Sequence, residues 1–157
     1  MSDQLPHYHQ TVRPEWIDYN GHMSEAFYVL VFGHSTDEMM VETGLDSGYR
    51  VKTGCSLYTV ETHIRYLHEV EEGAELTIRT RVLGVDEKKV RFSHEMYVGE
   101  PEGGEPVATT ELLALHIDQK AGHAAPFPEE VRERLTSLVE KAPEWAGRSI
   151  GPVPTAA

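Results

Sequence analysis

The sequence predicts an α+β fold in which a five-stranded antiparallel sheet wraps around one long central helix, with a second helix at the C-terminal end. One stretch near the start has the length of about five helical turns, and its first half, "AFYVLVF", leaves no polar face. From residue 55 onward the apolar residues recur with a period of two. A helix without a polar face must be covered on all sides, and a curled sheet can cover it.

The N-terminal part predicts a strand and then the helix. Residues 7–13 alternate weakly, as a strand does, and residues 24–43 form the helical stretch. Ser24 is the expected N-cap, and Gly44 is the expected stop. We expect the first half of the helix to be enclosed and the polar second half to emerge into solvent.

The remaining elements are four strands and a helix. Runs of β-branched and aromatic residues joined by short links predict an antiparallel meander. Pro128, followed by two acids, predicts the start of the last helix. The strands are expected at 55–67, 74–85, 89–99 and 106–118, and the helix at 128–141.

Composition limits the classes of protein. A chain of 157 residues with 39% hydrophobic content predicts one domain over 1–157, with a core at 8–141 and a loosely held tail at 143–157. The net charge of −12 disfavours nucleic acid and anionic membranes as partners. Neither a membrane span nor a secretory signal is recognisable, so we expect a cytoplasmic protein. The single cysteine, Cys55, rules out an internal disulfide and is expected to be buried.

Polar residues of catalytic type gather in one loop. The loop "DYNGHM" places Asp18, Asn20 and His22 directly before the long helix. A helix N-terminus presents unpaired N–H groups and a partial positive charge, which suits an oxyanion formed during acyl transfer. The same residue types also favour tight turns, so Asp18 can be a turn acid. For Asn20 and His22, a catalytic and a structural role remain equally open.

This loop before a long apolar helix, the segment "TGCSLYTVETHIRYLHEV" and the long strands resemble the hotdog-fold acyl-CoA thioesterases of the 4-hydroxybenzoyl-CoA type over residues 8–140. The resemblance implies a hydrolase that needs no cofactor, since coenzyme A enters as part of the substrate. It implies that the acid matching Asp18 acts as nucleophile or general base, and that an N–H group at about Glu25 holds the thioester oxygen. Whether Asp18 attacks the carbonyl or activates a water stays open.

The segments "RPEWIDYNGHM" and "APFPEEV" are further similar to thioesterases of carnitine breakdown that hydrolyse betainyl-CoA. That similarity implies a trimethylammonium acyl group, which favours aromatic faces and a carboxylate. Glu61 alternates with Thr59 and Arg65 on one face of its predicted strand, although a solvated glutamate paired with Arg65 gives the same pattern. The candidate substrate-binding residues are Trp16, Tyr19, Gly21, Met23, Tyr58 and Glu61.

Coenzyme A carries phosphates, so local bases must overcome the overall negative charge. The turn "DEKKVR" offers Lys88, Lys89 and Arg91, although such a run is also typical of a solvated turn. The nine histidines form no pair one helical turn apart, so we expect no metal site.

Two alternative functions remain. Hotdog enoyl-CoA hydratases carry a D-x-N-P-x-H loop, and "DYNGH" lacks both its proline and its spacing. A non-catalytic acyl-CoA-binding module is the other alternative. Because a wrapped sheet leaves open edges, and hotdog proteins pair along them, we expect a homodimer or homotetramer with the active site between subunits.

Overall fold

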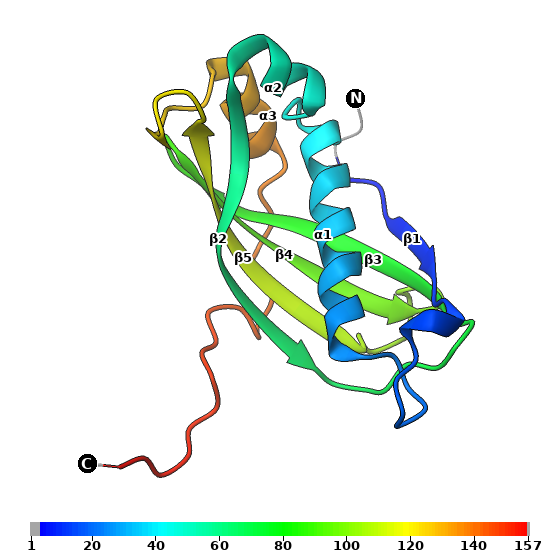
Figure 1. Cartoon of the computed structure of the whole chain (residues 1–157). Helices are drawn as coiled ribbons and strands as arrows, with labels where there is room; N and C mark the ends of the chain where they lie inside the picture. The colour runs from blue at the N-terminus through cyan, green and yellow to red at the C-terminus, as the bar shows by residue number, and fades with distance from the viewer. Residues whose placement is uncertain (1–3, 157) are drawn as a thin grey trace.

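The computed structural model describes residues 4–156. A curled antiparallel sheet wraps one side of the long helix α1 (Figure 1). This arrangement confirms the predicted α+β fold. The elements are β1 (Tyr8–Thr11), η1 (Pro14–Trp16), α1 (Glu25–Glu42), α2 (Ser47–Thr53), β2 (Cys55–Tyr66), β3 (Glu75–Val85), β4 (Lys89–Val98), β5 (Ala108–Asp118), β6 (His123–Ala124) and α3 (Glu129–Ser137).

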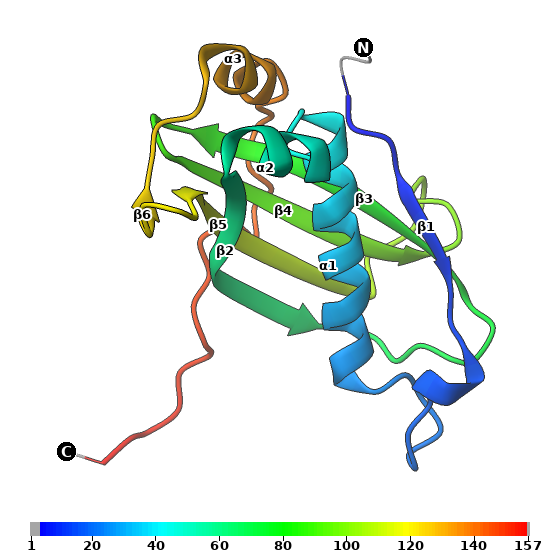
Figure 2. The same cartoon turned by 45° about the horizontal axis from the view of Figure 1, so that its top comes forward.

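The strands do not form the simple meander that the sequence predicts. The order across the sheet is β1-β3-β4-β5-β2, with the short β6 added to β5 (Figure 2). The segment between β2 and β3 is therefore a crossing connection rather than a hairpin. Val70 in this segment is buried, and its carbonyl accepts a hydrogen bond from Met23 N at 2.8 Å. This hydrogen bond holds the connecting segment beside the start of α1. Strand β2 pairs only with β5, so its other side is a free edge of the sheet.

Helix α1 begins and ends within one residue of the predicted bounds, and Gly44 follows with φ +84°. Each expectation about its exposure holds for some residues and fails for others. Val29 and Leu30 are 49% and 41% exposed, because the sheet covers only one side of the helix in the single chain. Ser35 and Thr36 in the second half are buried, and each hydroxyl donates to the carbonyl four residues earlier, at 3.0 and 3.2 Å. Intrahelical bonds let these polar side chains face the sheet.

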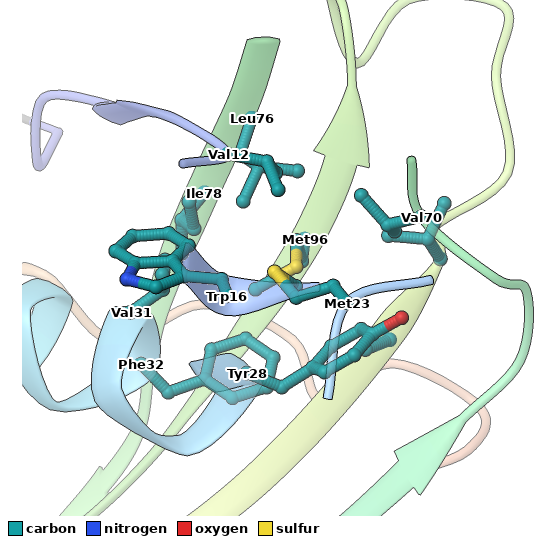
Figure 3. Packing of buried hydrophobic residues seen from close by; sticks show 12 residues of the cluster. Val12, Trp16, Met23, Tyr28, Val31, Phe32, Val70, Leu76, Ile78 and Met96 are labelled. Atoms are coloured by element: carbon teal, nitrogen blue, oxygen red, sulfur yellow. The ribbon is translucent and has the colours of Figure 1, made fainter. Parts of the chain in front are cut away.

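The core has two parts. The first surrounds the start of α1, where Trp16, Met23 and Tyr28 pack against β3 and β4 (Figure 3). The second joins the end of α1 to α3 through residues such as Phe92 and Leu135. The first cluster comprises Val12, Trp16, Met23, Tyr28, Val31, Phe32, Val70, Leu76, Ile78, Met96, Val107 and Ala108.

The C-terminal helix is shorter than predicted. Helix α3 ends at Ser137 rather than at residue 141, and Val139 then forms a parallel bridge with Val82 on the free edge of β3. The tail passes behind the sheet in the view of Figure 1. Gly147 N donates to Glu111 Oε1 at 2.6 Å, which ties the tail to β5.

Two local features also depart from expectation. Cys55 is partly exposed at the start of β2 rather than buried. Helix α2 was not predicted, although Asp46 gives a signal for it, since its side chain accepts from Tyr49 N at 2.8 Å. None of the helices in residues 4–156 has the length and apolar content needed to span a bilayer.

Candidate active site

The loop before α1 is a closed turn fixed at both ends. Ile17 and Met23 form an antiparallel bridge, and Ser24 N donates to Trp16 O at 2.9 Å. Gly21, at the tip, has φ +85°, a conformation that glycine adopts without strain. The bridge holds residues 18–22 beside the first turn of the helix.

Asp18 is half-buried at the base of this turn. Its Oδ1 accepts from Asn20 N at 2.8 Å, and its own N–H donates to His22 O at 3.1 Å. The turn role considered for Asp18 is therefore present. Oδ2 makes no hydrogen bond to any residue within 4–156, so one carboxylate oxygen remains for chemistry. Asn20 contributes its backbone N–H, while its side chain lies in an exposed stretch.

The first turn of α1 carries unpaired backbone donors. Ser24 occupies the N-cap position with extended φ and ψ, but its side chain makes no capping hydrogen bond. Phe27 N donates to Ser24 O at 3.0 Å. The N–H groups of Glu25 and Ala26 find no backbone acceptor within the described residues. Such donors, at the positive end of the helix dipole, can stabilise a developing oxyanion.

An open cleft of about 300 Å³ lies against this turn. The rings of Tyr28 and Tyr66 meet edge to face in it, with centroids 5.1 Å apart and planes at 87°. The Tyr28 hydroxyl donates to His68 O at 3.3 Å, which joins α1 to the segment after β2. The lining residues are His22, Met23, Glu25, Tyr28, Tyr66, Leu67, His68 and Glu69.

Carboxylates set the electrostatics of the cleft. His22 Nε2 lies 3.2 Å from Glu69 Oε2. Burial raises the pKa of Tyr28, and the neighbouring Tyr66 and Glu69 add to the effect. Burial also raises the pKa of Tyr66, together with the charge of Glu25. Both phenols therefore stay protonated at neutral pH.

The cleft brings together some of the residues predicted from the sequence. His22, Met23 and Glu25 line it, and Asp18 is bonded to His22 through the backbone. The other cleft residues were missed as site residues. The signal is the aromatic and polar run "RYLHE" at and just after the end of β2, which contributes to the family resemblance but was given no role in the site.

Trp16 and Tyr19 do not line the cleft. Trp16 is buried and stacks on Phe27 with centroids 5.4 Å apart, and the guanidinium of Arg13 lies 5.7 Å from its ring centroid. Tyr19 is 97% exposed at the tip of the loop. The predicted grouping of these rings with Glu61 is therefore absent within residues 4–156 of one chain.

Glu61 lies on the other face of the sheet. A β-bulge between Thr59 and Glu61 breaks the predicted alternation, so these two residues no longer share a face. Glu61 and His63 instead line a cavity of about 260 Å³ beneath the tail, with Arg91, Glu111 and Arg148. Tyr58 accepts a hydrogen bond from Gln119 Nε2 at 2.7 Å, away from α1. We place the candidate site in the cleft, because there the unpaired donors at the start of α1 meet a cavity next to the loop that carries Asp18 and His22.

The predicted phosphate-binding bases lie in the turn between β3 and β4 and at the start of β4, and this turn is at the other end of the sheet from the start of α1 (Figure 1). Lys88 N and Lys89 N both donate to Asp86 Oδ1, at 2.9 and 2.7 Å. These bonds, with that of Lys88 N the largest effect, lower the pKa of Asp86. Arg91 forms an ion pair with Glu111. Within one chain, these residues therefore form a solvated turn, the alternative to phosphate binding that the sequence also allows.

Metal-binding side chains do not cluster in the described part of the chain. Among residues 4–156, no group of three or more His, Cys, Asp or Glu residues is arranged to hold an ion. The expectation of a metal-free mechanism therefore remains a prediction.

Comparison with known proteins gives a consistent result. A family model described as the thioesterase-like superfamily matches residues 12–135. A betainyl-CoA thioesterase of Pseudomonas aeruginosa is 44% identical over 96% of this chain and 97% of its own. An L-carnitine dehydrogenase/betainyl-CoA thioesterase of Agrobacterium fabrum is 45% identical over 86% of this chain, which spans only 28% of that longer protein. A Staphylococcus aureus protein solved in complex with CoA superimposes with a TM-score of 0.86, at 27% identity and 98% coverage of both chains.

Proposed function

The chain belongs to the thioesterase-like superfamily, whose members hydrolyse thioesters, and from this premise we propose that it converts betainyl-CoA to betaine and free coenzyme A. The relative from Pseudomonas aeruginosa supports the acyl group, since the identity extends over almost the whole of both chains. The family match favours hydrolysis over the hydratase and binding-module alternatives. The observation that carries the proposal is the uncapped start of α1, which opens on the cleft, with Asp18 bonded through its backbone to the cleft residue His22.

The helix start supplies the oxyanion site. The thioester carbonyl oxygen accepts hydrogen bonds from the N–H groups of Glu25 and Ala26, and its negative charge grows as the carbonyl carbon is attacked. Because the Ser24 hydroxyl does not occupy these donors, they are available without rearrangement. Loss of one such donor typically costs about 10²–10³ in kcat.

Asp18 supplies the attack by one of two routes. In the first, its free oxygen attacks the carbonyl carbon, the C–S bond breaks, and water then hydrolyses the resulting mixed anhydride. In the second, Asp18 takes a proton from a water that attacks directly, and the same C–S bond breaks. Both routes need the carboxylate beside the cleft and no cofactor beyond the coenzyme A of the substrate.

A second subunit completes the proposed enzyme. Strand β2 is an unpaired sheet edge that carries the exposed residues Tyr58 and Val60, and Val29 and Leu30 are exposed on α1. Pairing of two β2 edges would satisfy the open backbone groups and cover these side chains. We expect light scattering to report a dimer or larger assembly, and Val60→Lys to weaken it. A stable, fully active monomer would contradict this arrangement.

Subunit pairing also bears on the distant bases. In an antiparallel pair of β2 edges, the far end of one sheet lies beside the helix start of the other subunit. Lys88 and Lys89 could then reach the phosphates of a coenzyme A whose thioester lies in the neighbouring cleft. Within a single chain the turn that carries them lies at the opposite end of the sheet from the start of α1 (Figure 1), and neither lysine lines that cleft.

Thiol release tests the function. Wild type and Asp18→Asn are compared on betainyl-, acetyl-, benzoyl- and long-chain acyl-CoA esters. Asparagine can still accept from Asn20 N, so we expect the fold to persist while kcat falls by about 10²–10⁴. Asp118→Asn is the matched control, since Asp118 Oδ1 accepts from Lys120 N and Ala121 N in a turn far from α1. Thiol release by the Asp18 variant at the wild-type rate would overturn the role of Asp18. No release by wild type from any ester would overturn the function.

A further inference from the structure

We propose that the cleft at the start of α1 is a quaternary-ammonium site, in which the rings of Tyr66 and Tyr28 and the carboxylate of Glu25 select a cationic acyl group. This inference rests on the proposed function and assigns the residues that determine its acyl specificity. It replaces the set of aromatic and acidic residues that the sequence suggested, which the fold separates.

The first observation is the geometry of the two rings. Tyr28 and Tyr66 stand perpendicular, at 87°, and form two walls of an aromatic corner that lines the cleft. Tyr66 is 45% exposed, so part of its ring is open to a ligand, whereas Tyr28 is 4% exposed and fixed by its bond to His68 O. Aromatic corners attract quaternary ammonium groups because ring faces carry negative potential.

The second observation is charge. The cleft contains two carboxylates and, among its described lining residues, neither lysine nor arginine. Glu69 is paired with His22, so its charge is partly offset when that ring is protonated. Glu25 makes no ion pair within residues 4–156, and its charge acts on Tyr66. The cleft therefore disfavours the phosphates of coenzyme A and favours a cation.

The third observation is where Glu25 stands on the helix. In a betainyl thioester a single methylene carbon separates the ammonium nitrogen from the carbonyl carbon. When the carbonyl oxygen meets the N–H groups of α1, the ammonium must therefore lie close to the positive end of the helix dipole, which repels it. A carboxylate in the first turn offsets that repulsion, and Glu25 is the acid in the first turn. A neutral acyl group has no such need.

Other parts of the chain are less suited to this cation. The ring of Trp16 is buried between Phe27 and the core, with Arg13 against it. The cavity that contains Glu61 also contains Arg91 and Arg148, which repel a cation. The corner formed by Tyr28 and Tyr66 combines open aromatic surface with uncompensated negative charge.

The test compares two acyl-CoA esters that differ in one atom. 3,3-Dimethylbutyryl-CoA has the shape of betainyl-CoA but carries a carbon in place of the ammonium nitrogen. We measure kcat/KM for both esters and take their ratio, which cancels general damage to the enzyme. Wild type is expected to prefer the betainyl ester by at least about 10-fold. Tyr66→Leu should lower the ratio by about 3- to 30-fold, and Glu25→Gln, which keeps the backbone donor, by about 2- to 5-fold.

Two further variants sharpen the result. Tyr66→Phe retains the ring and should keep most of the preference. Glu71→Gln makes the same charge change as Glu25→Gln at an exposed position of the β2–β3 connection outside the cleft, and should leave the ratio unchanged. Equal hydrolysis of the two esters by wild type, or a ratio unaffected in both Tyr66→Leu and Glu25→Gln, would overturn the ammonium site while leaving the thioesterase intact. Failure to release thiol from either ester would instead overturn the proposed function.

Discussion

The imidazole of His94 and the hydroxyl of Thr36 are hydrogen-bonded across the interface between sheet and helix, with Nε2 2.9 Å from Oγ1. The other ring nitrogen, Nδ1, lies 2.8 Å from Thr80 Oγ1. The ring is fully buried and stacks on Phe32 at an interplanar angle of 10°. Burial lowers the pKa of His94 to about 3, so the ring is neutral in the folded protein.

This buried ring predicts sensitivity to mild acid. The folded-state pKa lies below the usual value near 6.5, so protonation favours the unfolded chain. The contribution of His94 to stability is complete above pH 6.5 and is lost as the pH falls toward 3. Between pH 7 and pH 5 this loss amounts to about 2 kcal/mol. Urea denaturation of wild type and His94→Gln at both pH values measures it.

The comparison cancels the other titrating groups. We expect His94→Gln to be less stable than wild type at pH 7, because the glutamine packs less well beside Phe32. Its free energy of unfolding should, however, fall less between pH 7 and pH 5 than that of wild type. Equal losses in the two proteins would show that His94 titrates normally.

A buried carboxylate, that of Glu95, predicts a second effect on stability, on the face of the sheet opposite α1. Glu95 is 5% exposed, with Arg81 Nε at 2.7 Å and Arg79 Nη1 at 3.5 Å, and it accepts from the Tyr97 hydroxyl at 2.7 Å. Glu95→Gln leaves Arg81 without its counter-charge and Arg79 with Glu140 alone, and we expect a loss of about 2–3 kcal/mol, since both arginines are about a quarter exposed. Urea denaturation at pH 7 measures the loss.

Glu140 is the matched comparison for Glu95. It pairs with Arg79 at 2.7 Å but is 35% exposed, so Glu140→Gln should cost less than about 1 kcal/mol. A similar cost for the two variants would mean that burial of Glu95 does not govern the strength of this network.

The long helix, its bounds and the strand segments could be predicted because hydrophobic period and cap residues are local signals. The pairing of β2 with β5 could not, since it depends on Val70, one residue in a polar link whose burial under the start of α1 turns a hairpin into a crossing. The exposure of Val29 and Leu30 could not be predicted from the hydrophobic period either, because it depends on contacts with distant parts of the structure. A helix that is apolar on all sides is expected to be buried, but its sequence does not show whether the same chain or a second subunit buries it.

The site was predictable only where sequence neighbours are also neighbours in space. Asp18, His22 and Glu25 lie within one loop and one helical turn, and their proximity follows from the chain itself. Glu61 failed because a single inserted residue, Val60, moved it to the other face of the strand. Tyr66 was missed because its partner, Tyr28, comes from an element far away in the sequence.

The uncapped start of α1 predicts opposite effects on stability and activity. Ser24→Asp would place a carboxylate at the N-cap, where it can accept from the first-turn N–H groups. We expect a gain of about 0.5–1 kcal/mol in stability and a fall in kcat of at least about 10-fold, because the carboxylate competes with the oxyanion. Ser24→Ala should change stability by less than about 0.5 kcal/mol, since no capping bond is lost. A larger loss would show that Ser24 caps the helix in solution.

The turn at Lys88 and Lys89 predicts the salt dependence of substrate binding. The Lys89 ammonium lies 3.6 Å from Asp86 Oδ2, an exposed pair that a phosphate can replace at little cost. If these lysines contact coenzyme A, KM should rise with ionic strength, and replacing both by alanine should raise KM about 3- to 20-fold with little change in kcat. The double variant should also show a weaker salt dependence, because the charges that salt screens are gone. Lys141→Ala, which removes an exposed charge beyond α3, is the control for net charge.

An unchanged KM in the double variant would assign the phosphates to another surface, and Arg50 and Lys52 at the end of α2 would be tested next.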